Sequence, residues 1–174
     1  MPPADPDARS FLARNGMLAP CAADFVAAIL AAGNIRHLEP GQPIQHASDG
    51  ETGFWGLACG QGIYYPGLNS PGAATSMLAL PGDWGGLAPL FGEPRMGDGV
   101  ATVPTTLLWV PLHRARKLLA DNPGWWQCIA WLMALWTRRA FLLMADLQVA
   151  DSRARIAGVL LSLTDRRRFG NEGL

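Results

Sequence analysis

A single arginine stands in a stretch whose composition could serve a charged ligand. The stretch GGLAPLFGEPRMG, residues 85–97, lies between apolar, strand-like runs, and Arg95 is its one basic residue. Glycines and prolines are typical of turn-rich segments, and a guanidinium can neutralise an anion through charge-assisted hydrogen bonds. The stretch is therefore either a surface loop with a solvated arginine, paired with Glu93 or Asp98, or a cradle for a charged group.

The histidines and cysteines do not form the clusters that metal or nucleophile chemistry requires. The histidines fall on separate predicted elements without a His-x-His pair: His37, His46 and His113. A cupin-like metal enzyme is therefore a less favoured alternative. The cysteines are odd in number and far apart, which excludes a disulfide framework and an iron–sulfur ligand set: Cys21, Cys59 and Cys128. Without a Ser-His-Asp set or a Walker-type loop either, we expect no enzyme and no metal.

Composition places the chain among globular proteins without a charge-driven partner. Apolar residues make up 49% and charged residues 16% of the 174 residues, and the formal net charge is zero. That balance gives no electrostatic reason for the whole chain to bind nucleic acid or an anionic membrane. The N-terminus MPPADPDARS lacks the pattern of a signal peptide, and the scattered cysteines fit a reducing compartment. We therefore expect a cytoplasmic protein.

The sequence pattern along the chain changes from helix-like to strand-like and back to helix-like, and these elements must position Arg95. Residues 10–32 are rich in alanine and end at a Gly-Asn pair, which predicts N-terminal helices. From 35 to about 111, short strand-like runs alternate with Gly-, Pro- and Asp-rich breaks, which is typical of a β-sandwich or barrel, here of jelly-roll type. A short helix, a long helix and a helix capped by Asp151 follow.

The predicted fold class is α+β, mainly β. It is a jelly-roll barrel or sandwich flanked by N-terminal helices, a long C-terminal dimerisation helix and one further helix. We expect the jelly-roll domain with its N-terminal helices over 1–123, the dimerisation helix over 124–150, and a following helix and linker over 151–174.

The long helix carries an apolar seam with the 3-4 spacing of a coiled coil. The seam consists of Trp126, Ile129, Met133, Trp136, Ala140, Leu143, Leu147 and Ala150. The first half of the helix is apolar on more than one face, so it needs two neighbours. We favour the jelly roll and a second copy of the helix, and packing within one chain is the alternative. The apolar run 124–136 ends at Thr137-Arg138-Arg139, short of the ~18–20 residues of a membrane span.

The order of these elements resembles the effector-binding half of Crp/Fnr-type transcription regulators, which is built on the cyclic-nucleotide-binding domain. LEPGQPIQHASDGETGFWGLACGQG is similar to the family's opening hairpins. LPGDWGGLAPLFGEPRMGDGVATV is similar to its phosphate-binding cassette, usually of the form GD, GELALL, G-PRSATV. LLADNPGWW and residues 151–163 are similar to the entry to the dimer helix and to the helix after it. The similarity covers residues 11–164.

The resemblance implies a site for a cyclic phosphate. In the family, backbone N–H groups and an arginine hold the phosphate, a glutamate accepts a hydrogen bond from the ribose, and polar residues of the long helix read the base. Carried over to this chain, the candidate ligand-binding residues are Gly85, Gly86, Leu87, Ala88, Arg95, Met96, Ala140 and Phe141.

This chain departs from the family's pattern at several of these positions. Gly86, or Leu87, stands at the glutamate, and Met96 stands where a hydroxyl usually helps to hold the phosphate. Asp98 puts a carboxylate close to where a phosphate would lie, and the base-reading positions are apolar. We therefore expect weak cyclic-AMP binding or none. Another small anionic or apolar effector is the alternative, and the tryptophans would line an apolar pocket or serve as core: Trp55, Trp84, Trp109, Trp125, Trp126, Trp131 and Trp136.

The resemblance predicts the effector-sensing and dimerisation domain of a Crp/Fnr-type regulator. A ligand-free module that only dimerises is the alternative from another class. In the family a helix-turn-helix follows the last helix and reads DNA. This sequence ends at Leu174, where that module would begin, so we expect DNA binding only through a further C-terminal segment. The sequence is accordingly either a fragment of a longer regulator or a stand-alone sensor.

Overall fold

The structure is a computed structural model that describes residues 5–47, 52–66, 77–95 and 97–162. Its internal contacts divide the chain into two compact units, residues 1–126 and 127–174. The predicted division at 123 and 150 stays a prediction. The first unit carries the sheets and the second carries most of the long helix and the helix after it, and each is described by itself below.

Three helical segments open the first unit. They are α1 (Asp5–Arg14), a 3-10 turn η1 (Gly16–Leu18) and α2 (Ala23–Ala32). α1 starts at Asp5, before the residue 10 at which the sequence predicted helix. Arg9 on α1 donates to the carbonyl oxygens of Leu30 and Gly33, the latter at 2.9 Å, and so satisfies acceptors at the end of α2.

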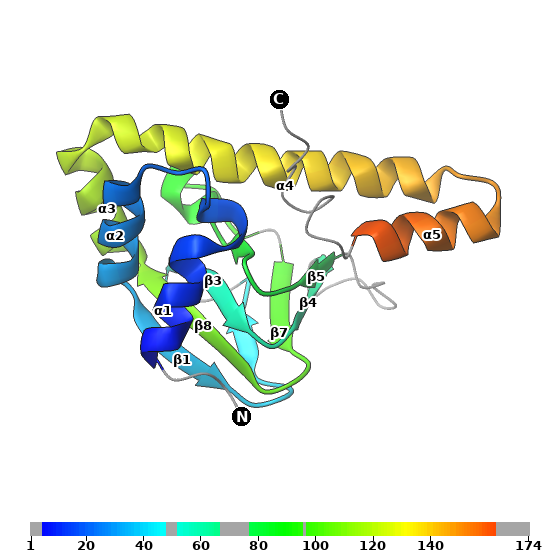
Figure 1. Cartoon of the computed structure of the whole chain (residues 1–174), viewed down its shortest axis with the longest axis horizontal. Helices are drawn as coiled ribbons and strands as arrows, with labels where there is room; N and C mark the ends of the chain where they lie inside the picture. Colours follow the sequence, from blue (N-terminus) through cyan, green and yellow to red (C-terminus); the bar gives the residue numbers. More distant parts are fainter. Residues whose placement is uncertain (1–4, 48–51, 67–76, 96, 163–174) are drawn as a thin grey trace. The chain divides into compact units, whose positions relative to one another are not determined.

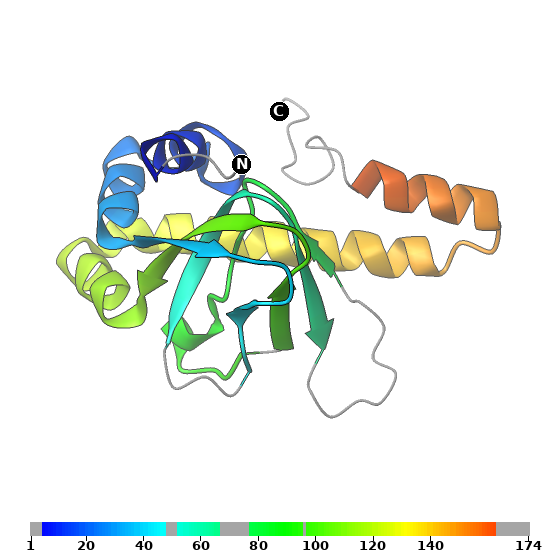
Figure 2. The same ribbon diagram turned by 90° about the horizontal axis from the view of Figure 1, so that it is seen from below.

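In the part of the chain that the structure describes, eight strands build two four-stranded antiparallel sheets. The strands are β1 (Asn34–Leu38), β2 (Pro43–Gln45), β3 (Gly53–Cys59), β4 (Gly62–Pro66), β5 (Met77–Ala79), β6 (Trp84–Gly85), β7 (Gly97–Ala101) and β8 (Thr105–Pro111). One sheet has the order β1-β8-β3-β6 and the other β2-β7-β4-β5, with α1 and α2 packed on the first sheet (Figures 1 and 2). The predicted jelly roll with flanking helices is confirmed.

The two sheets share one apolar core. Its members come from β2, β3, β5, β7 and β8, so they fill the interior between the sheets: Ile44, Trp55, Leu57, Ala79, Ala101, Leu107 and Trp109. A short helix η2 (Ala88–Phe91) lies between β6 and β7, and α3 (Leu112–Asp121) and η3 (Pro123–Trp125) follow β8. Burial of this apolar surface is the main stabilising contribution to the unit.

Tryptophans in the first sheet lie over glycines of neighbouring strands. Trp55 is paired with Gly85, and Trp84 with Gly56, across β3 and β6. A Cβ atom at Gly85 would lie 2.5 Å from the ring of Trp55, and one at Gly56 would lie 2.5 Å from the ring of Trp84. Neither ring could keep its place if its glycine carried a side chain. Both tryptophans are core residues.

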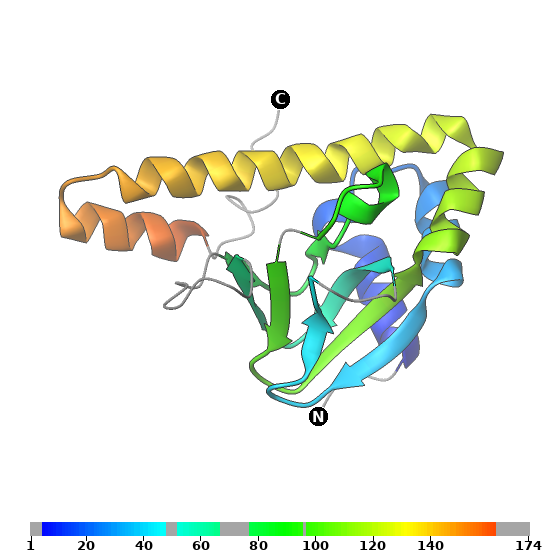
Figure 3. The same ribbon diagram turned by 180° about the vertical axis from the view of Figure 1, so that it is seen from behind.

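The second unit consists of α4 (Trp126–Leu147), which begins at the last residue of the first unit, and α5 (Ser152–Ser162). The two helices run side by side in opposite directions (Figure 3). Asp151 accepts hydrogen bonds from the backbone N–H groups of Arg153 at 2.7 Å and Ala154 at 3.3 Å. The predicted cap of this helix is therefore confirmed.

Burial along α4 changes from its first half to its second. Cys128, Ile129, Leu132 and Leu135 are buried, whereas Phe141 and Leu147 are 64% and 63% exposed. Within helical residues 123–147, a window of 18 residues has a mean hydropathy of 1.4 and is 22% buried, so by length and composition this helix could cross a membrane. From the sequence, the apolar run 124–136 was expected to be too short to span a membrane, but the apolar part of the helix extends beyond this run. The same composition is typical of a helix that packs against protein.

Candidate functional site

The cassette residues form a turn that leads from β6 to β7 and ends on Arg95. Gly86 has a φ of +78° and Gly92 has a φ of +80°, a region that favours glycine. Leu87 between them is buried at the start of η2. The glycines of the sequence motif thus stand where the backbone needs them, and Arg95 follows two positions before the start of β7.

Arg95 is turned into the protein and not into solvent. Its side chain is 7% exposed, and its Nη1 donates to the side-chain oxygen of Gln45 at 3.1 Å. Its Nη2 donates to the carbonyl oxygen of Gly53 at 2.8 Å, and the guanidinium lies 5.1 Å from the ring centre of Trp109. The interpretation as a solvated loop arginine is therefore wrong. Arg95 sits inside the jelly roll beside polar and aromatic groups.

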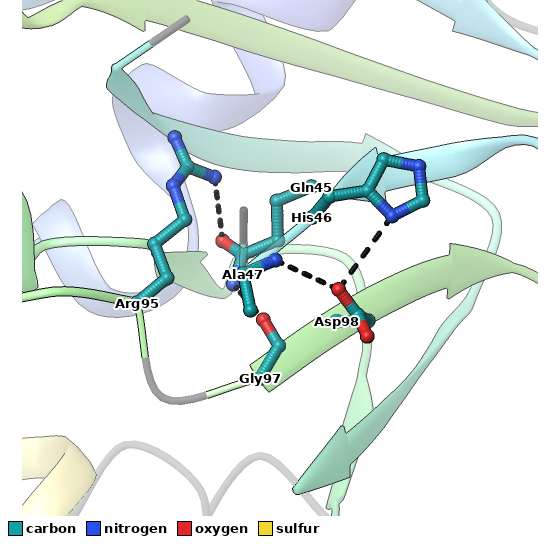
Figure 4. Close-up of polar contacts among 6 residues, drawn as sticks. All are labelled: Gln45, His46, Ala47, Arg95, Gly97 and Asp98. Carbon is teal, nitrogen blue, oxygen red and sulfur yellow. Dashed lines mark hydrogen bonds and ion pairs between the residues drawn. The ribbon is translucent and has the colours of Figure 1, made fainter. Parts of the chain in front are cut away.

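Asp98 lies away from Arg95, on the other side of residues 45–47 (Figure 4). Its carboxylate accepts a hydrogen bond from the backbone N–H of Ala47 at 2.7 Å and lies 3.5 Å from Nδ1 of His46. The expectation that this carboxylate lies close to a bound phosphate stays a prediction, although here the carboxylate faces Ala47 and His46 and not Arg95. Strand alternation explains this, because Asp98 points to the opposite face from its neighbours Gly97 and Gly99.

Gln45 reaches the interior because β2 contains a bulge. Pro43 pairs with Val100 and Gln45 pairs with Gly99, so two steps along β2 match one step along β7. Such an extra residue breaks the alternation of faces. As a result Ile44 and Gln45 are both buried, although they are consecutive. Without the bulge, a core-facing Ile44 would leave Gln45 on the outer face.

Gln45 joins Arg95 to two aromatic side chains. Nε1 of Trp55 donates to the side-chain oxygen of Gln45 at 3.0 Å, and Nε2 of Gln45 donates to the carbonyl oxygen of Gly97 at 2.9 Å. The ring of Tyr64 stacks on Trp55 with centroids 6.0 Å apart. Burial raises the pKa of the Tyr64 phenol above its usual range, although hydrogen bonds with Trp55 and Gln45 and the charge of Arg95 oppose the shift. Tyr64 as a whole is partly buried and packs against the apolar core.

Gly86 contacts this cluster directly. A Cβ atom at Gly86 would lie 2.9 Å from the side-chain oxygen of Gln45 and 3.3 Å from Nε1 of Trp55. A side chain at this position would therefore enter the space that Gln45 and Trp55 occupy. We call Gln45, Trp55, Tyr64 and Arg95 the polar cluster.

The structure brings together some of the predicted ligand-binding residues. Gly85, Gly86, Leu87, Ala88 and Arg95 belong to one continuous turn in the first unit. Met96 lies outside the described residues. The predicted base-reading residues, Ala140 and Phe141, are on α4 in the second unit. Their role in binding stays a prediction.

The sequence reasoning missed Gln45, Trp55 and Tyr64 as neighbours of Arg95. A signal for Trp55 is present, since the Gly85-Gly86 pair leaves space for a large ring from β3. Gln45 carries no such signal, because a polar residue next to the apolar Ile44 reads as the solvent face of a strand. Among the residues that the structure describes, no three His, Cys, Asp or Glu side chains gather into a metal site.

No protein-family model matches the sequence, and no curated protein matches it significantly. The structure, however, is similar to solved structures of regulatory proteins. It matches the catabolite activator protein of Thermus thermophilus with a TM-score of 0.61 and 25% identity, over 75% of this chain and 62% of that one. The chain thus spans less than two thirds of that protein's length.

Two further structures share the fold at lower identity. The sensor domain of the transcriptional regulator DNR from Pseudomonas aeruginosa matches with a TM-score of 0.57 and 17% identity, over 75% of this chain and 91% of that one. The regulatory domain of Toxoplasma gondii PKA with cAMP matches with a TM-score of 0.55 and 18% identity, over 69% and 49%. The described residues therefore have the fold of a cyclic-nucleotide-binding domain of the Crp/Fnr type, as the sequence predicted.

Proposed function

We propose that this chain is the effector-sensing and dimerisation domain of a Crp/Fnr-type regulator. The observation that carries the proposal is the place of Arg95, which the cassette turn brings inside a jelly roll of this type. The mechanism would be a population shift, in which a ligand favours one of two arrangements of the protein. Here a ligand at the cassette would bias the arrangement of the long helices in a dimer.

The apolar surface of the second unit supports dimerisation. Leu147 lies on the predicted seam of α4 and is 63% exposed in the single chain, and Phe141 beside the seam is 64% exposed. Exposed apolar residues such as these favour a protein partner, and the 3-4 seam of the sequence favours a second copy of the helix in that role. DNA binding would need a helix-turn-helix such as the one that follows the last helix in the resembled family.

Substitution at the seam tests dimerisation. Leu147→Glu should convert a dimer to a monomer in sedimentation, because it places a charge in an apolar interface. Leu160→Glu on α5 is the matched control, since Leu160 is 61% exposed and lies off the seam. A wild-type chain that sediments as a monomer at high concentration would contradict the proposal, as would equal effects of the two variants.

Titration calorimetry with cyclic AMP and cyclic GMP tests effector binding. We expect weak cyclic-AMP binding or none, because Gly86 supplies no carboxylate and Arg95 already has interior partners. Micromolar cyclic-AMP binding would contradict that expectation while supporting a sensor role.

A ligand-free module that only dimerises is the second candidate. The favouring observation is the polar cluster, in which Gln45 accepts hydrogen bonds from both Arg95 and Trp55. This candidate predicts a dimer that binds none of the anions tested.

A further inference from the structure

Gln45 holds the position at Arg95 that the oxygen of an anionic ligand would take. Its side-chain oxygen accepts from Nη1 of Arg95 and from Nε1 of Trp55, and its amide nitrogen donates to the carbonyl oxygen of Gly97. We propose that Gln45 is a built-in competitor, so that a phosphate group binds this cradle only by displacing the Gln45 amide. This inference rests on the proposed sensor function, and it names the residue that sets the specificity of that site.

The competitor is effective because it is part of the chain. A tethered group competes at a high effective concentration, whereas a free ligand must lose translational freedom to bind. The bulge in β2 fixes Gln45 with its side chain inward and 3% exposed. The amide oxygen of Gln45 accepts two hydrogen bonds and its amide nitrogen donates one. Moving the Gln45 side chain out of the cluster breaks these bonds and therefore costs free energy.

The glycine at position 86 and the inward-pointing Gln45 depend on each other sterically. The resemblance places a glutamate at Gly86, and any side chain there would start 2.9 Å from the Gln45 oxygen. A glutamate at this position and Gln45 in its observed rotamer therefore exclude each other. Nε1 of Trp55 would lie 3.3 Å from the same Cβ atom. A side chain at position 86 would therefore meet both Gln45 and Trp55.

The Gln45 amide also indicates which anion can replace it. The amide offers an acceptor to Arg95 and Trp55 and a donor to Gly97, so a replacement needs both functions. Hydrogen phosphate carries acceptor oxygens and an O–H donor. A cyclic phosphodiester and sulfate carry acceptors only, and they would leave the Gly97 carbonyl oxygen without its donor. We therefore assign the site to a small protonated oxyanion, with inorganic phosphate as the probe.

The test compares phosphate binding by the full chain and by Gln45→Ala in titration calorimetry. Removal of the competitor should tighten phosphate binding by about 10- to 100-fold, as expected when one hydrogen bond to a charged group no longer has to be broken. The gain should vanish in Gln45→Ala/Arg95→Gln, and sulfate should bind Gln45→Ala more weakly than phosphate does. Gln42→Ala is the matched control, because Gln42 is exposed directly before β2 and accepts from the backbone N–H of Glu39.

Equal affinities of wild type and a folded Gln45→Ala, including no binding by either, would overturn the proposal. Sulfate binding as tight as phosphate would overturn the assignment to a protonated anion.

A second measurement uses the wild-type chain, so that the proposal can be tested even if Gln45→Ala does not fold. In the wild type, phosphate should shift the indole N–H resonance of Trp55, assigned with Trp55→Phe, and Gln45→Glu should abolish the shift because its carboxylate holds Arg95. An unmoved Trp55 resonance at molar phosphate would refute displacement. This test can fail separately from the proposed function. If Gln45→Ala gains phosphate binding but the chain is a monomer, the dimeric sensor is contradicted, whereas the proposal that Gln45 competes with phosphate still holds.

Discussion

Arg116 on α3 donates a hydrogen bond from Nη2 to the carbonyl oxygen of Pro89 at 2.9 Å, across 27 positions of sequence. Pro89 lies in η2, so this bond links the cassette turn to the helix that follows the jelly roll. The carbonyl belongs to a short 3-10 segment with few internal hydrogen bonds. The Arg116 bond therefore supports a turn that its own backbone holds weakly.

Arg116→Leu should loosen this turn. We expect a loss of about 1 kcal/mol in the free energy of unfolding, typical of one hydrogen bond from a charged group at the surface. Amide exchange of Leu90 and Gly92, whose N–H groups bond within η2, should become faster. Arg114→Leu is the matched control, since Arg114 on the same helix donates to the carbonyl oxygen of Ala32 instead. Equal exchange in both variants would contradict the link.

Gly86→Ala should destabilise the chain more than Gly92→Ala. Both glycines have a φ near +80°, so both substitutions meet the left-handed backbone penalty of about 1–2 kcal/mol. A Cβ at Gly86 would also meet Gln45 at 2.9 Å, whereas a Cβ at Gly92 has nothing within 4 Å. Urea unfolding of the two variants gives the difference, which measures how tightly the polar cluster is packed. A difference near zero would show that Gln45 moves aside freely.

Tyr64→Phe should flatten the loss of stability in alkaline solution. The pKa of the Tyr64 phenol is raised in the folded state by burial, so the folded protein holds its proton more strongly than the unfolded chain does. This stabilisation is present below the unfolded pKa of about 10 and is lost as the pH rises above it. Chemical unfolding at several alkaline pH values measures the slope. Tyr65→Phe is the control, and an unchanged slope in Tyr64→Phe would refute the assignment.

Most strands were predictable because they are separate apolar or alternating runs between turn residues. β7 was predicted only from Val100 onward, because Gly97, Asp98 and Gly99 read as part of a glycine-rich break. β6 was missed, since its two residues, Trp84 and Gly85, lie in the break PGDWGG and read as a turn. The pairing of Trp84 with Gly56 on β3 makes the strand, and that pairing is a long-range contact. Propensity within a short window cannot report such a contact.

The position of Arg95 was predictable, but its direction was not. The resemblance to the family's cassette predicted its place in this turn, and the φ values of Gly86 and Gly92 explain the glycines there. Its main partner, Gln45, is 50 residues away, and it points inward only because of a one-residue bulge. A bulge changes which face a residue occupies without changing the composition of the strand, so the sequence pattern leaves it unseen.

The tryptophan and glycine pairs of the first sheet impose a rule on the sequences that this fold can accept. A glycine at 85 is useful only while a large ring stands at 55, and Trp55 fits only while residue 85 has no side chain. Substitutions at these two positions should therefore be tolerated together and rejected singly, and the same holds for Gly56 and Trp84. Homologous chains should accordingly show correlated substitutions at each pair. A homologue with a small residue at 55 could carry a side chain at 85, and also at the neighbouring cassette position 86.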